Sequence, residues 1–94
     1  MKRLEIVVDT PHLERLLSRL RDAGAKGYTV LPNASGFGDR GTQRGDDPSG
    51  VSGNTCVLLA VPVEDAPKIL EATRAALRRT GGICLVSDCQ WLEY

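Results

Sequence analysis

The sequence predicts an α+β domain in which strands and helices follow the order βαββαβ. Four segments have the alternation or composition of strands, and two have apolar residues at helical spacing between clear start and stop signals. This order is the split-βαβ, ferredoxin-like arrangement. The length of 94 residues suits one domain covering residues 1–94.

The first strand and the first helix follow from two different periods. Apolar residues at positions 4, 6 and 8 alternate with charged residues at 3 and 5, which is the period of a half-buried strand. Thr10 and Pro11 then predict a helix start, with Thr10 as N-cap and Pro11 as the first helical residue. Gly24 is placed to end this helix. Its apolar stripe comprises Leu13, Leu16, Leu17 and Leu20.

Two strands flank a long polar loop. Residues 26–32 (KGYTVLP) predict the second strand because Tyr28, Thr29 and Val30 favour strands. Residues 55–61 predict the third, and their nearly continuous apolar run indicates burial on both faces. The loop between them, residues 36–53, is rich in Gly, Ser, Asp and Arg. Structureless loops longer than about 12–15 residues are uncommon in compact domains unless they are functional or disordered, so the function is expected here.

The second helix and the last strand complete the pattern. Glu64, Asp65 and Pro67 give an acidic, proline-bearing helix start, and Gly81 with Gly82 ends the helix. Residues 83–87 (ICLVS) predict the fourth strand. The inner stripe of the helix comprises Ile69, Leu70, Thr73, Ala76 and Leu77. Its water-facing side comprises Lys68, Glu71, Arg74 and Arg78.

Charge and hydropathy exclude several classes of partner. Twelve basic and twelve acidic residues cancel, which argues against a nucleic acid or an anionic membrane held by bulk charge. The longest apolar run, residues 57–63, is far shorter than a membrane span of about 20 residues. No charged segment followed by an apolar stretch starts the chain, so a cytoplasmic protein is expected. A domain of this size gains stability from oligomerisation.

The chemistry-bearing side chains outside the loop form no recognisable catalytic or metal cluster. Cys56 and Cys84 lie in predicted strands and are expected to be buried, whereas Cys89 is expected to be the exposed thiol. His12 is expected on the surface of the first helical turn, without a Cys, Asp or Ser arrangement around it. Trp91 and Tyr94 are expected to pack or to contact another subunit.

The beginning of the loop has the residues of an anion-binding segment. Gly36, Gly38 and Gly41 let a backbone approach a ligand closely, because glycine has no Cβ and tolerates positive φ. Arg40 and Arg44 can each donate two hydrogen bonds to a phosphate or carboxylate. The alternative is that these arginines are solvated and pair with the nearby acidic residues Asp39, Asp46 and Asp47. Phe37, between two glycines, is expected to pack into a core, a ligand or a partner.

Several of these residues, taken in order, resemble the PII signal-transduction family. The run GYTV at residues 27–30 and then GFG at residues 36–38 is similar to that family's signature, and Val61-Pro62 and Thr80-Gly81 also fit. Five residues separate Val30 from Gly36 where the family pattern has four, which predicts a bulge or a longer end in the second strand. The family's glycine- and lysine-bearing phosphate loop is shortened, and residues 39–53 contain no tyrosine for a uridylylation switch.

The shortened turn and the loop arginines resemble the PII-like proteins of inorganic-carbon metabolism, which are associated with carboxysomes or bicarbonate transporters. This resemblance implies a non-catalytic, ferredoxin-like homotrimer that binds adenine nucleotides between subunits and signals through the loop. AMP or ADP is favoured over Mg-ATP because the phosphate-loop lysine is missing, with ATP or cyclic AMP as further candidates and bicarbonate as a second ligand. The implied nucleotide site comprises Thr29, Gly36, Phe37, Gly38, Arg40, Gly41, Arg44, Leu58, Ala60, and Gly81 and Gly82 of the neighbouring chain.

Two other classes of function stay open at this point. A small ferredoxin-like enzyme could use the loop as a lid, but the sequence offers no nucleophile-base pair and no carboxylate pair. A cation-binding or structural trimer of the same fold could use acidic residues as ligands, although their spacing matches no recognised site. The acidic residues in question are Asp39, Asp46, Asp47 and Asp88.

Overall fold

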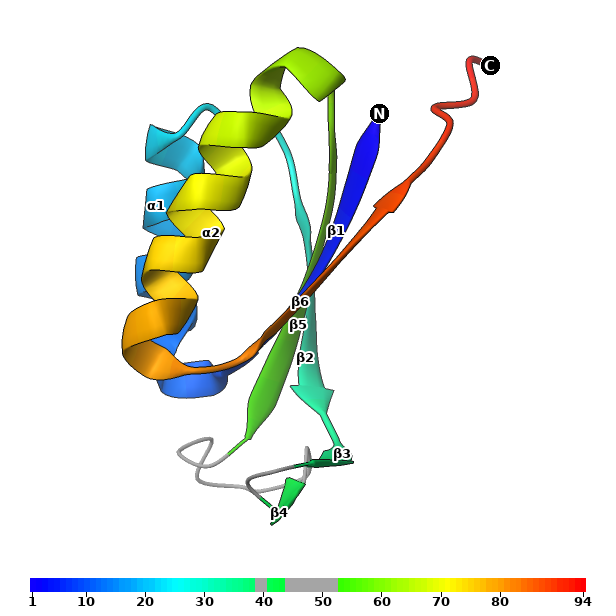
Figure 1. The fold of residues 1–94 in the computed structure, drawn as a ribbon. Helices are drawn as coiled ribbons and strands as arrows, with labels where there is room; N and C mark the ends of the chain where they lie inside the picture. Colours follow the sequence, from blue (N-terminus) through cyan, green and yellow to red (C-terminus); the bar gives the residue numbers. More distant parts are fainter. Residues whose placement is uncertain (39–40, 44–52) are drawn as a thin grey trace.

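Four antiparallel strands form one sheet, and two helices lie against one face of it (Figure 1). The computed structural model describes residues 1–38, 41–43 and 53–94. The sheet has the order β2-β5-β1-β6. Its strands are β1 (Lys2–Asp9), β2 (Thr29–Ala34), β5 (Asn54–Val61) and β6 (Ile83–Asp88). The helices are α1 (Leu13–Asp22) and α2 (Ala66–Thr80), each preceded by a 3-10 turn, η1 (Thr10–His12) and η2 (Val63–Asp65). The predicted order βαββαβ is confirmed.

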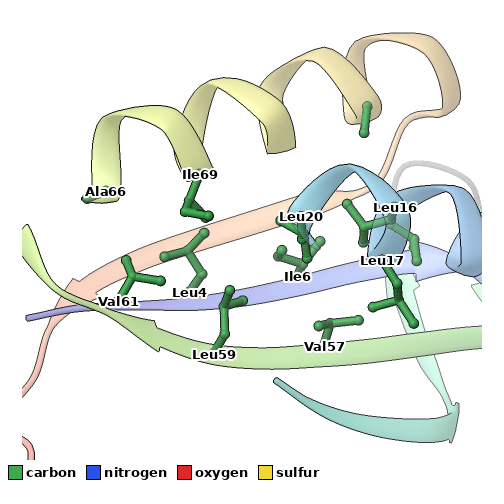
Figure 2. Packing of buried hydrophobic residues seen from close by; sticks show 12 residues of the cluster. Leu4, Ile6, Leu16, Leu17, Leu20, Val57, Leu59, Val61, Ala66 and Ile69 are labelled. Carbon is green, nitrogen blue, oxygen red and sulfur yellow. The ribbon is translucent and has the colours of Figure 1, made fainter. Parts of the chain in front are cut away.

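The core lies between the sheet and the helices (Figure 2). Every second residue of β1 and β5 is buried, which matches the period of a pleated strand with one covered face. The predicted stripe of α1 is confirmed at Leu16, Leu17 and Leu20, and Leu13 packs at its margin. In α2 the buried residues are Ala66, Ile69, Thr73 and Ala76. The Thr73 hydroxyl donates a hydrogen bond to the Ile69 carbonyl, so its burial leaves no unpaired polar group.

The second face of the sheet is not covered by the described part of the chain. Burial on both faces was expected for residues 55–61, but Cys56, Leu58 and Ala60 are only half-buried. The prediction is wrong for the single chain because both helices pack on the other face (Figure 1). The apolar run of β5 therefore provides a core on one face and an open apolar surface on the other.

The start of the first helix differs from the expected N-cap. Thr10 is not the cap: the residue before η1 is Asp9, and no side chain caps the turn or α1. The Thr10 hydroxyl instead shares a hydrogen bond of 2.9 Å with the hydroxyl of buried Thr55 on β5. The Thr10 N–H also donates to the Gly53 carbonyl at 2.8 Å. Both contacts join the end of β1 to the point where the long loop rejoins the sheet.

The second strand is shifted and carries the predicted bulge. It begins at Thr29 rather than at residue 26, and it continues through Pro32, which an edge strand tolerates. Leu31 pairs with Cys56, and Ala34 pairs with Asn54, so β2 has one extra residue between these pairs. Asn33 accommodates the extra residue at φ 62°, a left-handed conformation that asparagine adopts more easily than most residues.

The beginning of the long loop is not structureless. Residues 36–38 form β3 (Gly36–Gly38), which pairs antiparallel with β4 (Gly41–Gln43). Residues 36–53 were expected to form one long loop without strands, whereas Gly36 and Gly38 belong to a two-stranded hairpin that extends from the end of β2 (Figure 1). Neither helix of the described segments is long and apolar enough to cross a bilayer.

The turn between α2 and β6 depends on a close approach of backbone to backbone. Gly81 and Gly82 have φ values of 77° and 122°, and Gly81 closes the helix as predicted. A Cβ on Gly82 would lie 2.7 Å from the Val7 carbonyl oxygen and 3.0 Å from Leu77 Cδ2. A carbonyl oxygen in a paired strand cannot move aside cheaply. Gly82 is therefore required by the fold, whatever else it contacts.

We expect Gly82→Ala to lower the free energy of unfolding by about 2 kcal/mol or more, because it adds both a strained φ and a backbone clash. Chemical denaturation measures this change. Gly27→Ala is the matched control, since its Cβ would meet nothing within 4 Å. Equal stability of the two variants would show that the turn can move away from β1.

Candidate functional site

The open face of the sheet carries side chains in rows that run across all the strands. Directly paired residues of antiparallel strands point to the same face. One row comprises Leu31, Cys56, Val7 and Ile83. The next comprises Thr29, Leu58, Glu5 and Leu85, and the third comprises Ala60, Arg3 and Ser87. Apolar side chains dominate this face, and the large ones remain accessible: Leu31 is 47% exposed, Ile83 55% and Leu85 59%.

Three of the expected site residues lie on this face. Thr29 on the edge strand β2 is paired with Leu58 on β5, and Ala60 follows on the same face of β5. The structure therefore brings Thr29 and Leu58 together. Thr29 is exposed, so its hydroxyl is available to a ligand approaching the edge of the sheet.

The polar centre of the open face is an ion pair between Arg3 and Glu5. Arg3 Nη2 lies 2.9 Å from Glu5 Oε1. The two side chains stand two residues apart on β1 and so share one face. Leu58 and Leu85 flank Glu5 on the neighbouring strands. A partner that covers this face would also cover the ion pair.

The loop residues of the expected site are only partly described. Gly36, Phe37 and Gly38 form β3, and Gly41 begins β4. Arg40 and Arg44, the expected phosphate ligands, lie outside the described residues. Phe37 is 85% exposed, so it does not pack into the core of its own chain. A ligand or a partner remains as its predicted contact.

The remaining expected residues lie at the opposite edge of the sheet. Gly81 and Gly82 lead into β6, whereas Thr29 and the hairpin belong to β2. Two strands, β5 and β1, separate these edges, a distance of about 14 Å across the sheet. One chain thus carries two separate halves of the expected site. They can form one cleft only if the β2 edge of one subunit meets the β6 edge of another.

The cysteine predictions are partly wrong. All three thiols are half-buried, so Cys89 is not the exposed one. The Cys89 N–H bonds to the Met1 carbonyl, which holds this residue beside the start of β1. Burial raises the pKa of the Cys84 thiol. Burial and then the charge of Glu5 raise the pKa of Cys56, while Arg3 opposes this change.

Other predictions about surface side chains also need correction or stay open. His12 is half-buried rather than exposed, because it lies between the start of α1 and the end of α2. Trp91 is 60% exposed and Tyr94 is fully exposed, so neither packs within its own chain. Contact with another subunit remains a prediction for both. Among residues 1–38, 41–43 and 53–94, no three His, Cys, Asp or Glu side chains gather as a metal site.

Comparison with known proteins places this geometry in a family. The model of the family described as nitrogen regulatory protein P-II matches residues 1–93. The chain belongs to the P-II family. A search of curated protein sequences found no match. The P-II match agrees with the fold and with the signature residues 27–30 and 36–38.

Solved structures give a more specific likeness. The chain is similar to CPII, a nitrogen regulatory PII-like protein from Thiomonas intermedia K12, in a structure bound to ADP, AMP and bicarbonate. The identity is 32%, the TM-score is 0.85, and the match covers 96% of this chain and 86% of that one. A second CPII structure, bound to ADP and bicarbonate, matches with 31% identity, a TM-score of 0.81 and the same coverage.

A more distant P-II relative has the same fold. A PII-like signalling protein from Thermus thermophilus matches with 28% identity and a TM-score of 0.68, covering 92% of this chain and 82% of that one. The chain is therefore a PII-like regulatory protein whose structural relatives in the CPII group bind ADP, AMP and bicarbonate.

Sequence reasoning missed part of the open face. The expected site did not include Arg3, Glu5, Leu31 or Leu85, although all four lie in the same rows as Thr29, Leu58 and Ala60. The alternation in β1 placed Arg3 and Glu5 opposite the core, but it did not show which side chains of β2 and β6 stand beside them. Only the strand order and the register of the sheet show which side chains are neighbours on this face.

We expect Glu5→Gln to lower the Cys56 pKa and so to speed alkylation of Cys56 by iodoacetamide near pH 8. The reason is that the Glu5 charge opposes formation of the thiolate. The measurement compares rates against pH in chains whose only cysteine is Cys56, at a dilution at which sedimentation shows single chains, so that the open face is uncovered. Chains whose only cysteine is Cys84 are the control, since burial alone raises that pKa. A slower reaction at Cys56, or equal acceleration at Cys84, would contradict the assignment.

Proposed function

We propose that this P-II protein is a homotrimer that binds ADP or AMP in the clefts between its subunits and signals through residues 36–53. The observation that carries this proposal is the division of the expected site between the two edges of one sheet, next to an open apolar face. A second subunit is what would bring Thr29 and the hairpin of one chain to Gly81 and Gly82 of another. The nucleotide-bound CPII structures support the choice of ligand.

The phosphate chemistry favours a short phosphate chain. Only Gly81 and Gly82 separate α2 from β6, so the turn offers no lysine to distal phosphates. Arg40 and Arg44 are the proposed donors to the phosphates that remain, since guanidinium groups bind phosphate through paired hydrogen bonds. The proposed base and ribose contacts are Thr29, Leu58, Ala60 and the backbone of residues 36–38.

The proposed role is regulation of inorganic-carbon use. Bicarbonate bound to CPII supports it as a second ligand of this chain, and a bicarbonate transporter or a carboxysome-related protein is the proposed partner. Ligand contacts that order a loop are a known way to switch a partner surface. The protein is proposed to act in the cytoplasm as a sensor rather than as an enzyme. Calorimetric titration with AMP, ADP and ATP, each with and without bicarbonate, tests this function.

We expect Arg40→Ala and Arg44→Ala each to weaken ADP binding by about 1.5–3 kcal/mol, the usual contribution of a hydrogen bond to a charged group. Calorimetry measures the change. Arg74→Ala is the control, because Arg74 is exposed on α2 and pairs only with Glu71 among the described residues. Equal, small losses in all three variants would refute phosphate contact by the loop arginines.

We expect Leu85→Glu to convert the trimer to a monomer, because it places a second carboxylate directly opposite Glu5 on the face that a neighbouring subunit would cover. Sedimentation velocity measures the assembly state. Val63→Glu is the matched control, since Val63 is 58% exposed and Leu85 59%, but Val63 lies in η2 rather than on the open face. A wild-type chain that stays monomeric over the tested concentrations would refute the trimer.

A further inference from the structure

A cluster of basic side chains lies between the two helices, which cover the face of the sheet opposite the open face (Figure 1). The helices run antiparallel, so the start of α1 lies beside the end of α2 (Figure 1). A small cavity opens between them with buried Leu16 and Ala76 in its wall. Its basic lining residues are His12, Arg15, Arg19 and Arg79. We call these four residues and their apolar wall the basic groove.

The arginines of this groove have no acidic partner in the described part of the chain. Two other arginines of the described part pair with a nearby acid, Arg3 with Glu5 and Arg74 with Glu71. No ion pair joins Arg15, Arg19 or Arg79 to an acidic side chain within residues 1–38, 41–43 and 53–94. Arg15 and Arg19 stand four residues apart on one helix, an arrangement of like charges that slightly destabilises a helix. Stability of the fold does not explain the cluster.

The shape of the groove limits what it can bind. Its cavity has a volume of about 10 Å³, room for one water-sized group, so a nucleotide does not fit inside. Arg15 and Arg19 are about 6 Å apart along α1, and Arg79 lies on α2 across the groove. Charges spread over two helices suit a ligand with several separated negative groups and a small apolar group, rather than one compact anion.

We propose that the basic groove docks an acidic segment of a partner protein. Carboxylates of that segment pair with Arg15, Arg19 and Arg79, and a small apolar side chain covers the cavity next to Ala76. The chain as a whole has no net charge, so its positive potential is local to such patches. A local patch fits a short acidic peptide better than a long polyanion. This surface is separate from the proposed nucleotide site.

The test uses the full chain and a fluorescent peptide of repeated Glu-Glu-Ala units, with binding followed by fluorescence anisotropy. We expect the peptide to bind and a repeated Gln-Gln-Ala peptide not to bind. Arg15→Glu and Arg79→Glu should each weaken binding by about tenfold or more, which is the scale of one lost charge-assisted hydrogen bond. Arg78→Glu makes the same change of charge on the residue before Arg79 in α2, outside the groove, and should weaken binding less than about twofold.

Several results would overturn the proposal. Equal weakening by Arg78→Glu would show that the peptide binds to positive charge anywhere on the surface and not to the basic groove. Tighter, Arg15-dependent binding of duplex DNA or of anionic lipid vesicles would assign the groove to phosphates. Absence of peptide binding by the wild-type chain would refute the docking surface. Circular dichroism of each variant excludes unfolding as the cause of weaker peptide binding. Titration of the Arg15→Glu variant with ADP shows separately whether the proposed nucleotide site is intact.

Discussion

The structure depends on one constraint: a sheet with large apolar side chains on both faces is covered by helices on only one. Burying an exposed leucine or isoleucine contributes about 1.5–3 kcal/mol, and Leu31, Ile83 and Leu85 all stand on the open face. Because each of the three is only about half exposed, covering them contributes roughly 2–5 kcal/mol, a sizeable fraction of the net stability of a small domain, about 5–15 kcal/mol. Folding and assembly of this chain are therefore expected to be linked, since a subunit that covers this face stabilises the folded state.

The same constraint accounts for the division of the expected site. The open face is bounded by β2 on one side and β6 on the other, and each edge carries a different group of site residues. Thr29 and the β3–β4 hairpin lie on the first, and Gly82 leads into the second. A contact that covered the apolar rows would also bring edges of different subunits near each other. Assembly and ligand binding would then use neighbouring surfaces.

Local patterns were enough to predict the element order and the buried stripe of α1, because each follows from residues close together in the sequence. The bulge in β2 was predicted from the spacing between Val30 and Gly36 compared with the pattern of the family that the sequence resembles. The failures have non-local causes: the Thr10 hydroxyl finds Thr55 on a distant strand, and Leu58 stays half-buried because of where the helices pack. Gly82 was expected to border a ligand, and its close approach to Val7 could not be read before the strands were placed. The contacts of Arg40 and Arg44 stay a prediction.

Both roots of the long loop are fixed to the sheet, and this affects how the loop can signal. At the first root, the bulge at Asn33 turns the chain before Ala34 pairs with Asn54. At the second, the Gly53 carbonyl accepts a hydrogen bond from the Thr10 N–H. A ligand bound to β3 and the edge of β2 would contact a loop that is fixed to the sheet at both ends. Its binding would therefore favour one conformation of the loop rather than change the conformation of the whole domain. The same base continues through Thr10 to His12, the first residue of the basic groove, so the loop and the groove share one anchored segment of the fold.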